Sequence, residues 1–233
     1  DRALLDAQGH WLLFETTQDI LAVDRNGTAD LYRLDLIEDL LLLVSRTPRG
    51  AAGNGPSRYS AADASGDWIL LQSDAQDLVA DETNAVTDIF LHQWAFGTTR
   101  RITETADHAS AHPVVDAAGR DLLFDQASAD GQRHILIERP WGGTAQPLES
   151  GDDSAGALED HHHPAISADG RFVAFIAEQI TPDSALCQVQ FIDRDRGLDQ
   201  RVACPAVLAS DAQAARPHFN PDGDLLEWQL KDK

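Results

Sequence analysis

The sequence predicts an all-β fold made of a repeated unit of four short antiparallel strands, and three observations support that prediction. A glycine turn recurs five times along the chain, at intervals of roughly 50 to 60 residues. The run after each glycine is apolar on both faces, as expected of a strand covered on both sides. Further strand-like runs follow before the next turn. The turn glycines are Gly9, Gly66, Gly119, Gly170 and Gly223.

The unit is clearest in the stretch His163–Phe175, which reads HPAISADGRFVAF. An extended segment leads into a tight turn at Ala168-Asp169-Gly170, and an apolar strand follows. Asp-Gly between two apolar runs is a strong hairpin signal, because glycine adopts positive φ without steric cost. We therefore expect this turn, with its glycine, in every copy.

The positions around the glycines agree between copies. Residues three and five places after each glycine are apolar, and proline stands six places before it in three copies. An acid stands three places before the glycine in the first three copies and one place before it in the last two. These sets are Leu12, Ile69, Leu122, Val173 and Leu226; Phe14, Leu71, Phe124, Phe175 and Trp228; Pro113, Pro164 and Pro217; and Asp6, Asp63, Asp116, Asp169 and Asp222. The copies therefore share one register.

Each repeat divides into strands at regular places. The segment Leu36–Val44 is rich in helix-favouring residues, but its place in the repeat predicts a strand. The repeats span residues 2–48, 58–105, 112–150, 163–205 and, in part, 216–230. The expected strands include Arg2–Asp6, Trp11–Thr17, Ala29–Leu36, Asp39–Arg46, Arg58–Ala62, Trp68–Ser73, Thr87–Gln93, Thr98–Thr103, Leu122–Gln126, Arg133–Glu138, Arg216–Asn220 and Asp224–Leu230.

Four short strands per unit at this spacing are typical of a β-propeller blade, whereas the strands of a sandwich do not repeat in fours. We predict a single β-propeller domain over residues 1–233, with about four and a half blades present. The expected ring has five or six blades. The chain opens in mid-pattern without an initiator Met. We therefore expect a fragment of a larger ring, an incompletely built chain, or a small ring that lacks two strands.

Composition excludes several classes of function. Asp and Glu number 39 against 18 Lys and Arg, which gives a formal net charge of −21. Such a chain repels the phosphates of nucleic acid and of anionic membranes, so neither is an expected partner. No apolar run approaches the roughly 20 residues of a spanning helix, and no signal peptide is visible. The sequence also lacks the G-x-S-x-G, H-E-x-x-H, P-loop and G-x-G-x-x-G motifs, so no catalytic residue is predicted.

The stretch HPAISADGRFVAF, together with QDLVADETNAVTDIFLHQWAFGTTRRIT in the second repeat, resembles the WD40-like repeats of TolB-type β-propellers. The resemblance covers nearly the whole chain. It implies a periplasmic or secreted protein that binds another protein or peptide without catalysis. Two alternatives stay open at this point. The chain could be the propeller domain of a hydrolase, peptidase or lyase, or a structural subunit of a larger extracytoplasmic complex.

Two cysteines predict an oxidising compartment. Cys187 and Cys204 fall on the third and fourth expected strands of the fourth repeat, and their midpoint lies between Asp195 and Arg196, inside the turn DRDRG. A simple hairpin therefore places them opposite each other, at a separation that suits a disulfide. A disulfide is typical of extracytoplasmic proteins.

Asp and Asn residues cluster before the third strand of the first two repeats. The loops read DRNGTAD and DETNAVTD, and in both an Asn is followed four residues later by Asp. Oxygen-rich clusters of this kind can bind calcium, the one candidate cofactor, although the spacing is not that of an EF-hand. Asx turns are the structural alternative, and we favour them. The candidate calcium ligands are Asp24, Asn26, Asp30, Asp81, Asn84 and Asp88.

The residue seven places before each glycine is a candidate for partner binding. In a propeller the first strand of each blade lines the central channel, so these residues would form a ring near one mouth. Most of them can carry positive charge and could attract an anionic group of a partner peptide. The structural alternative, which we favour, is that they cap a strand edge before proline. The five residues are Arg2, Tyr59, His112, His163 and Arg216.

The run Glu159–His163 places three adjacent histidines after two acids. Imidazole is a good ligand for zinc or copper. Adjacent residues of a strand point to opposite faces, however, so the three histidines are not expected to face one ion. We predict a solvated loop.

Overall fold

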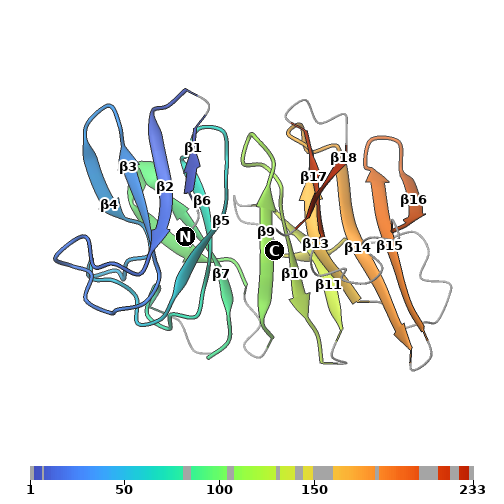
Figure 1. Ribbon diagram of the computed structural model, residues 1–233, viewed down its shortest axis with the longest axis horizontal. Helices are drawn as coiled ribbons and strands as arrows, with labels where there is room; N and C mark the ends of the chain where they lie inside the picture. Colours follow the sequence, from blue (N-terminus) through green and yellow to red (C-terminus); the bar gives the residue numbers. More distant parts are fainter. Residues whose placement is uncertain are drawn as a thin grey trace. The chain divides into compact units, whose positions relative to one another are not determined.

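A computed structural model of the chain describes residues 3–6, 8–80, 85–103, 108–129, 132–139, 144–148, 160–181, 184–204, 215–220 and 226–230. Within these ranges the chain forms antiparallel sheets and one short 3-10 helix, η1 (Trp94–Phe96), as Figure 1 shows. None of the described residues forms a helix long and apolar enough to cross a membrane. The all-β prediction is confirmed.

The chain divides into two compact units, residues 1–113 and 114–233. The first holds two complete sheets, and each has its four strands in sequence order. The first sheet contains β1 (Ala3–Leu5), β2 (Trp11–Thr16), β3 (Asp30–Asp35) and β4 (Leu40–Leu43), and the second contains β5 (Ser57–Ala62), β6 (Trp68–Ser73), β7 (Asp88–Gln93) and β8 (Thr98–Arg101). The leucine-rich segment thus forms a turn over residues 36–39 and then the strand β4, where its place in the repeat predicts a strand.

The other two four-stranded sheets follow the same order, and a two-stranded sheet comes last. The third sheet contains β9 (Ser110–Val115), β10 (Leu122–Ala127), β11 (Arg133–Glu138) and β12 (Gln146–Pro147); the fourth contains β13 (Asp160–Ile166), β14 (Phe172–Thr181), β15 (Ser184–Asp193) and β16 (Leu198–Ala203); and the last pairs β17 (Ala215–Phe219) with β18 (Leu226–Leu230). These strands match the predicted repeats closely. The turn at Gly223 lies outside the described residues.

The hairpin turns between first and second strands share one geometry. Gly9, Gly66, Gly119 and Gly170 have φ values of 70°, 69°, 67° and 77°. Each glycine N–H donates to the carbonyl three residues earlier, at 2.8 to 3.1 Å. Only glycine adopts this left-handed conformation without strain, so the prediction of a glycine turn is confirmed in all four described copies.

A side chain caps each of these turns. In the first two copies Asp6 and Asp63 accept the backbone N–H of the residue that opens the second strand, both at 2.9 Å. In the fourth copy Ser167 occupies this position, and its hydroxyl accepts the N–H of Phe172 at 2.9 Å. The same hydroxyl donates to Asp169 at 2.6 Å. This hydrogen bond holds the pKa of Asp169 below its ordinary value and explains why the acid moves two places in this copy.

Neighbouring sheets within each unit pack through alternate faces of their second strands. In the first unit Trp11 and Leu13 of β2 share a buried core with Ile69 and Leu71 of β6. In the second unit β10 and β14 pack in the same way, and Leu123 shares a core with Val173 and Phe175. The second strands of the second, third and fourth sheets are therefore buried on both faces, as predicted.

The first sheet departs from this expectation on one face. In β2 only alternate residues are buried, and Leu12 and Phe14 are half-buried. Their equivalents, Ile69 and Leu71, are fully buried against the first sheet. The face that bears Leu12 and Phe14 is thus less well covered than the matching face of the next sheet.

The predicted disulfide is present. Cys187 on β15 and Cys204, directly after β16, are bonded, with Cα atoms 5.4 Å apart. The adjacent pair in the hairpin is Gln188 with Ala203, and the N–H of Cys204 donates to the carbonyl of Cys187 at 3.1 Å. The symmetry of the hairpin about its turn thus sets the pairing, as the sequence indicates.

Replacing Gly66 with alanine is expected to cost more stability than the same change at Gly9. Both glycines are left-handed, so each substitution should cost about 1 kcal/mol of backbone strain. A Cβ on Gly66 would also overlap the indole ring of Trp11, whereas one on Gly9 meets no atom within 4 Å. Denaturant unfolding should show Gly66→Ala to be less stable than Gly9→Ala by a further ~1–3 kcal/mol.

The double variant Trp11→Leu/Gly66→Ala provides the control. Because Leu is smaller than the indole ring, the alanine at position 66 should cost less in that background. Equal losses at the two glycines would contradict the packing described for the second strands.

Candidate functional site

The histidine run lies on a buried strand, and the predicted solvated loop is wrong. Asp160–Ile166 forms β13, and His162 and His163 are 4% and 8% exposed. The physical reason is the length of β14, which runs on past the core and offers Ala177 and Glu178 as pairing partners for the start of β13. The first strand of this sheet therefore begins three residues earlier than the repeat pattern indicates.

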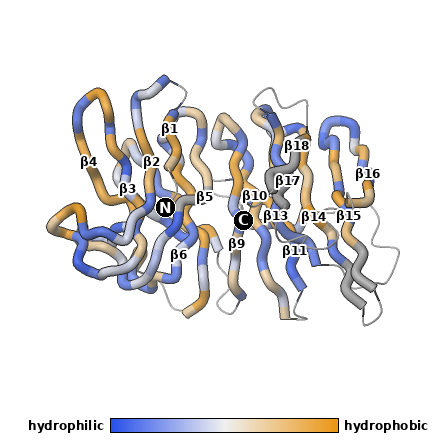
Figure 2. Tube along the Cα trace, viewed as in Figure 1, coloured by the Kyte–Doolittle hydropathy of each residue, from blue (hydrophilic) through white to orange (hydrophobic). Residues whose placement is uncertain are grey.

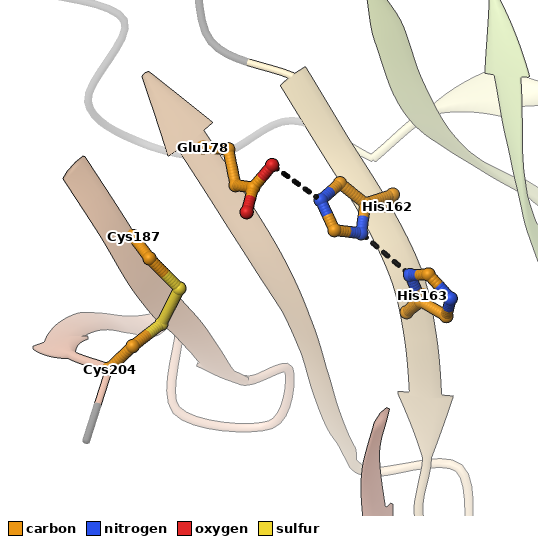
Figure 3. Close-up of a disulfide and its surroundings, with 5 residues drawn as sticks. All are labelled: His162, His163, Glu178, Cys187 and Cys204. Atoms are coloured by element: carbon orange, nitrogen blue, oxygen red, sulfur yellow. Dashed lines mark hydrogen bonds and ion pairs between the residues drawn. A yellow bond between two sulfur atoms is a disulfide. The ribbon is translucent and has the colours of Figure 1, made fainter. Parts of the chain in front are cut away.

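A β-bulge brings two adjacent histidines together. The register of β13 against β14 shifts between His162 and Ala165, and His163 has a φ of 53°. The bulge breaks the alternation of side chains, so the two imidazole rings meet with their Nδ1 atoms 2.6 Å apart (Figure 3). One of these nitrogens carries the shared hydrogen. The expectation that adjacent histidines point apart fails here, because it assumes a regular strand.

Charged groups surround this pair. His162 Nε2 lies 3.3 Å from the carboxylate of Glu178 on β14. The backbone N–H of His163 donates to Asp125 at 3.2 Å, and Asp125 is fully buried and paired with Arg133. The Cys187–Cys204 disulfide lies next along the sheet, because Cys187 pairs with Glu178 across β14 and β15. The result is a buried polar centre that joins the third and fourth sheets.

Other residues seven places before the turn glycine lie at similar points. His112 on β9 has a φ of 51°, close to that of His163, and proline follows both histidines. The pairing of β5 shifts register directly after Tyr59. Left-handed non-glycine residues are strained, and strain of this kind gathers at functional sites. Arg2 lies outside the described residues, as do the side chains of Tyr59 and Arg216. Partner binding through the predicted ring stays a prediction.

The first calcium candidate is a hydrogen-bonded loop. Asn26 Oδ1 accepts the N–H of Thr28 at 2.8 Å, which is an Asx turn. Asn26 Nδ2 donates to Asp30 at 2.6 Å and to the carbonyl of Gly53 at 2.7 Å. Asp24 accepts the hydroxyl of Tyr32. The oxygens proposed as ligands therefore already accept protein donors.

Asp30 and Asp88 perform the same structural task in successive sheets. Asp30 accepts the hydroxyl of Ser45 at 2.6 Å, and Asp88 accepts that of Thr103. Each hydroxyl also accepts the N–H of the residue after the aspartate, at 3.0 and 3.2 Å. The end of the fourth strand is thereby held to the start of the third. Aligning the repeats by Asp30 and Asp88 would have revealed the shared Ser/Thr fifteen residues later.

Metal binding remains to be tested. Asp81 and Asn84 lie outside the described residues. Among the residues that are described, no three His, Cys, Asp or Glu side chains are grouped to hold a metal ion. A calcium ion at Asp24, Asn26 and Asp30 stays a prediction and would have to displace the hydrogen bonds above. A calcium titration after chelator treatment, followed by calorimetry, tests it.

No protein-family model and no curated protein matches the sequence. Solved structures match the fold. A protein assigned as a TolB from Agrobacterium tumefaciens has a TM-score of 0.63 at 18% identity, over 99% of this chain and 74% of its own. TolB from Acinetobacter baumannii has a TM-score of 0.59 at 15% identity, over 97% and 48%. These likenesses show the TolB-type β-propeller fold and confirm the predicted fold class.

Propellers of other functions share this fold. An oligogalacturonate lyase in complex with manganese has a TM-score of 0.65 at 13% identity, over 99% of this chain and 58% of its own. A prolyl endopeptidase structure has a TM-score of 0.55, also at 13% identity, over 93% of this chain and 29% of its own. The chain thus spans less than two thirds of several of these proteins, and fold alone does not separate a scaffold from an enzyme.

Burial of Asp30 should make stability depend on pH. Burial raises the pKa of Asp30 to about 6, from an ordinary value of 3.8. The folded state therefore favours the protonated acid, and the stability gained from protonation is lost as the pH rises from about 4 through 6. Asp30→Asn should remove this loss. The measurement is the difference in unfolding free energy between wild type and variant, at intervals from pH 4 to 7.

The difference in unfolding free energy between wild type and Asp30→Asn cancels the contribution of His92, which is present in both proteins and depends on pH in the opposite direction. Burial lowers the pKa of that residue to about 4, so it destabilises the fold as the pH falls below about 6.5. As a control, Ser45→Ala keeps the carboxyl but removes its hydroxyl donor, and should move the transition to higher pH. A difference that stays constant from pH 4 to 7 would contradict the role given to Asp30.

Proposed function

We propose that this chain, with its TolB-type β-propeller fold, is a non-catalytic scaffold that binds another protein or peptide in the periplasm or outside the cell. The observation that carries the proposal is the likeness of this fold to the two TolB structures. Asp6, Asp30, Asp63 and Asp88 each accept hydrogen bonds that hold turns or strands in place. These four acids therefore have structural roles in the sheets.

The disulfide supports the location. Disulfides persist in oxidising compartments such as the periplasm and are rare in the cytosol. The Cys187–Cys204 bond closes a short hairpin in which backbone hydrogen bonds already set the register. A protein that works outside the cytoplasm gains stability from such a bond.

The predicted ring of residues seven places before the turn glycines is the binding site that we propose. His112 is half-buried and lies on an edge strand of its sheet, so part of its side chain can reach a partner. His163 is more buried, and its ring faces His162. His112 is therefore the more accessible of the two described members.

The test is a native pull-down with the whole chain, followed by mass spectrometry. His112→Glu reverses the charge that this position can carry and should weaken capture of the partner at least tenfold. His112→Asn is the matched control, because asparagine tolerates the left-handed backbone and carries no charge. Unchanged capture by His112→Glu, His163→Glu and Arg216→Glu together would refute the binding ring. A partner that stays in a fixed ratio through purification would favour the alternative of a structural subunit.

A lyase-like enzyme is the second candidate function. The observation that favours it is the centre of His162, His163 and Glu178, which sets two imidazoles against a carboxylate. The likeness to an oligogalacturonate lyase in complex with manganese points to the same class. Cleavage of oligogalacturonate by the purified chain, lost in His162→Ala, would establish it. Equal cleavage by the wild type and by His162→Ala would rule out this centre as the catalytic site.

A further inference from the structure

The outer edge of β4 has unpaired backbone groups. The N–H of Val44 donates to the carbonyl of Leu31 at 2.8 Å, and Leu42 and Leu40 continue the pairing with β3. Because hydrogen-bonded pairs alternate in an antiparallel ladder, the N–H and C=O of Leu41 and Leu43 point away from β3. In the part of the chain that the structure describes, no backbone hydrogen bond reaches these outward groups.

The other outer strands carry charged residues or proline, and β4 does not. Edge strands avoid pairing with foreign strands through charged residues, proline or short length. The fourth strand of the second sheet, β8, ends in Arg100 and Arg101, and β12 is two residues long and contains Pro147. In β16, Asp199 and Arg201 interrupt the apolar residues. In contrast, β4 consists of four leucines.

An apolar row crosses the first sheet and ends on β4. Leu5, Leu12, Leu34 and Leu41 stand opposite one another on successive strands. They lie on the less covered face of the sheet, and Leu5 is 55% exposed. Figure 2 shows β4 as hydrophobic along its length. A strand added beside β4 could therefore place apolar side chains next to Leu41, in line with this row.

The residues before β4 are acidic. Glu38 and Asp39 are exposed in the turn that precedes the strand, and Asp35 lies beside them. An antiparallel strand beside β4 would end at this turn. A Lys or Arg at the C-terminal end of that strand would meet the carboxylates, and the charges would complement one another.

We propose that the edge of β4 binds an extended, apolar segment of a partner protein as a fifth antiparallel strand, with a basic residue at its C-terminal end. The inference rests on the proposed binding function and names a surface apart from the predicted ring. Recognition of this kind uses main-chain hydrogen bonds for affinity and alternate side chains for specificity. Here Leu41 and Leu43 supply the hydrogen bonds, Leu41 the apolar contact, and Glu38 and Asp39 the charge.

Three variants and two peptides test the proposal. The probe is the acetylated peptide Val-Thr-Val-Leu-Val-Lys-Lys, and hydrogen exchange should show slowed exchange at Leu41 and Leu43 of the whole chain when it binds. Leu41→Pro removes an N–H that bonds nothing within the sheet and should weaken binding about tenfold or more. Leu41→Lys keeps the backbone N–H and places a charge on the edge strand, which disfavours pairing with another strand. It should also weaken peptide binding, and it replaces the proline variant if that variant does not fold. Glu38→Lys should weaken this peptide but not one that ends in two Thr residues.

The outcomes separate this inference from the proposed function. A partner captured equally by wild type and Leu41→Lys, but lost in His112→Glu, would overturn the β4 site and keep the binding ring. Dimerisation of wild type at high concentration, abolished by Leu41→Lys, would show that a second copy takes the edge and would also overturn the proposal. Peptide binding with protection of Leu41 and Leu43 supports the β4 site even where His112→Glu has no effect.

Discussion

The four-stranded sheets depend on one local constraint, a left-handed glycine that closes the hairpin between their first and second strands. The glycine turns the chain, and an oxygen acceptor three residues earlier binds the N–H that opens the second strand. With both in place, the second strand starts at a fixed point relative to the first. Its alternate side chains are then committed to the two faces of the sheet, because the side-chain period of a strand is two.

Packing between sheets follows from that fixed start. One face of β2 meets the opposite face of β6, and the same relation holds between β10 and β14. Polar contacts add to the apolar core. In the first unit the guanidinium of Arg33, on β3, lies 3.7 Å from the ring centroid of Trp94 in η1 and 5.7 Å from that of Trp11. Such a buried cation is stabilised by the ring faces and by Asp35, 3.7 Å away.

The sequence was sufficient to predict most of the fold, because glycine, apolar alternation and hairpin symmetry act locally. The strands, the left-handed glycines and the Cys187–Cys204 pair all follow from spacing alone. The site was harder to predict, since it depends on departures from regularity. The bulge at His163 reverses the direction of one side chain, and no pattern in the run of histidines shows where the register slips. Likewise, the sequence suggests Asp30 and Asp88 as calcium ligands. Their hydrogen-bond partners, Ser45 and Thr103, lie fifteen residues later in the chain and could not be recognised from the loop alone.

In the fourth repeat Ser167 stands where the first three repeats have an aspartate, and this affects how further repeats of this kind are recognised. The turn tolerates a neutral hydroxyl because a second acid, Asp169, orients it. The turn requires an oxygen that accepts the backbone N–H at the start of the second strand. One aspartate can supply this oxygen, or a serine that is oriented by a hydrogen bond to an aspartate. A sequence repeat that lacks the aspartate three residues before its glycine can therefore still form this turn, if it has a Ser there and an Asp two residues later.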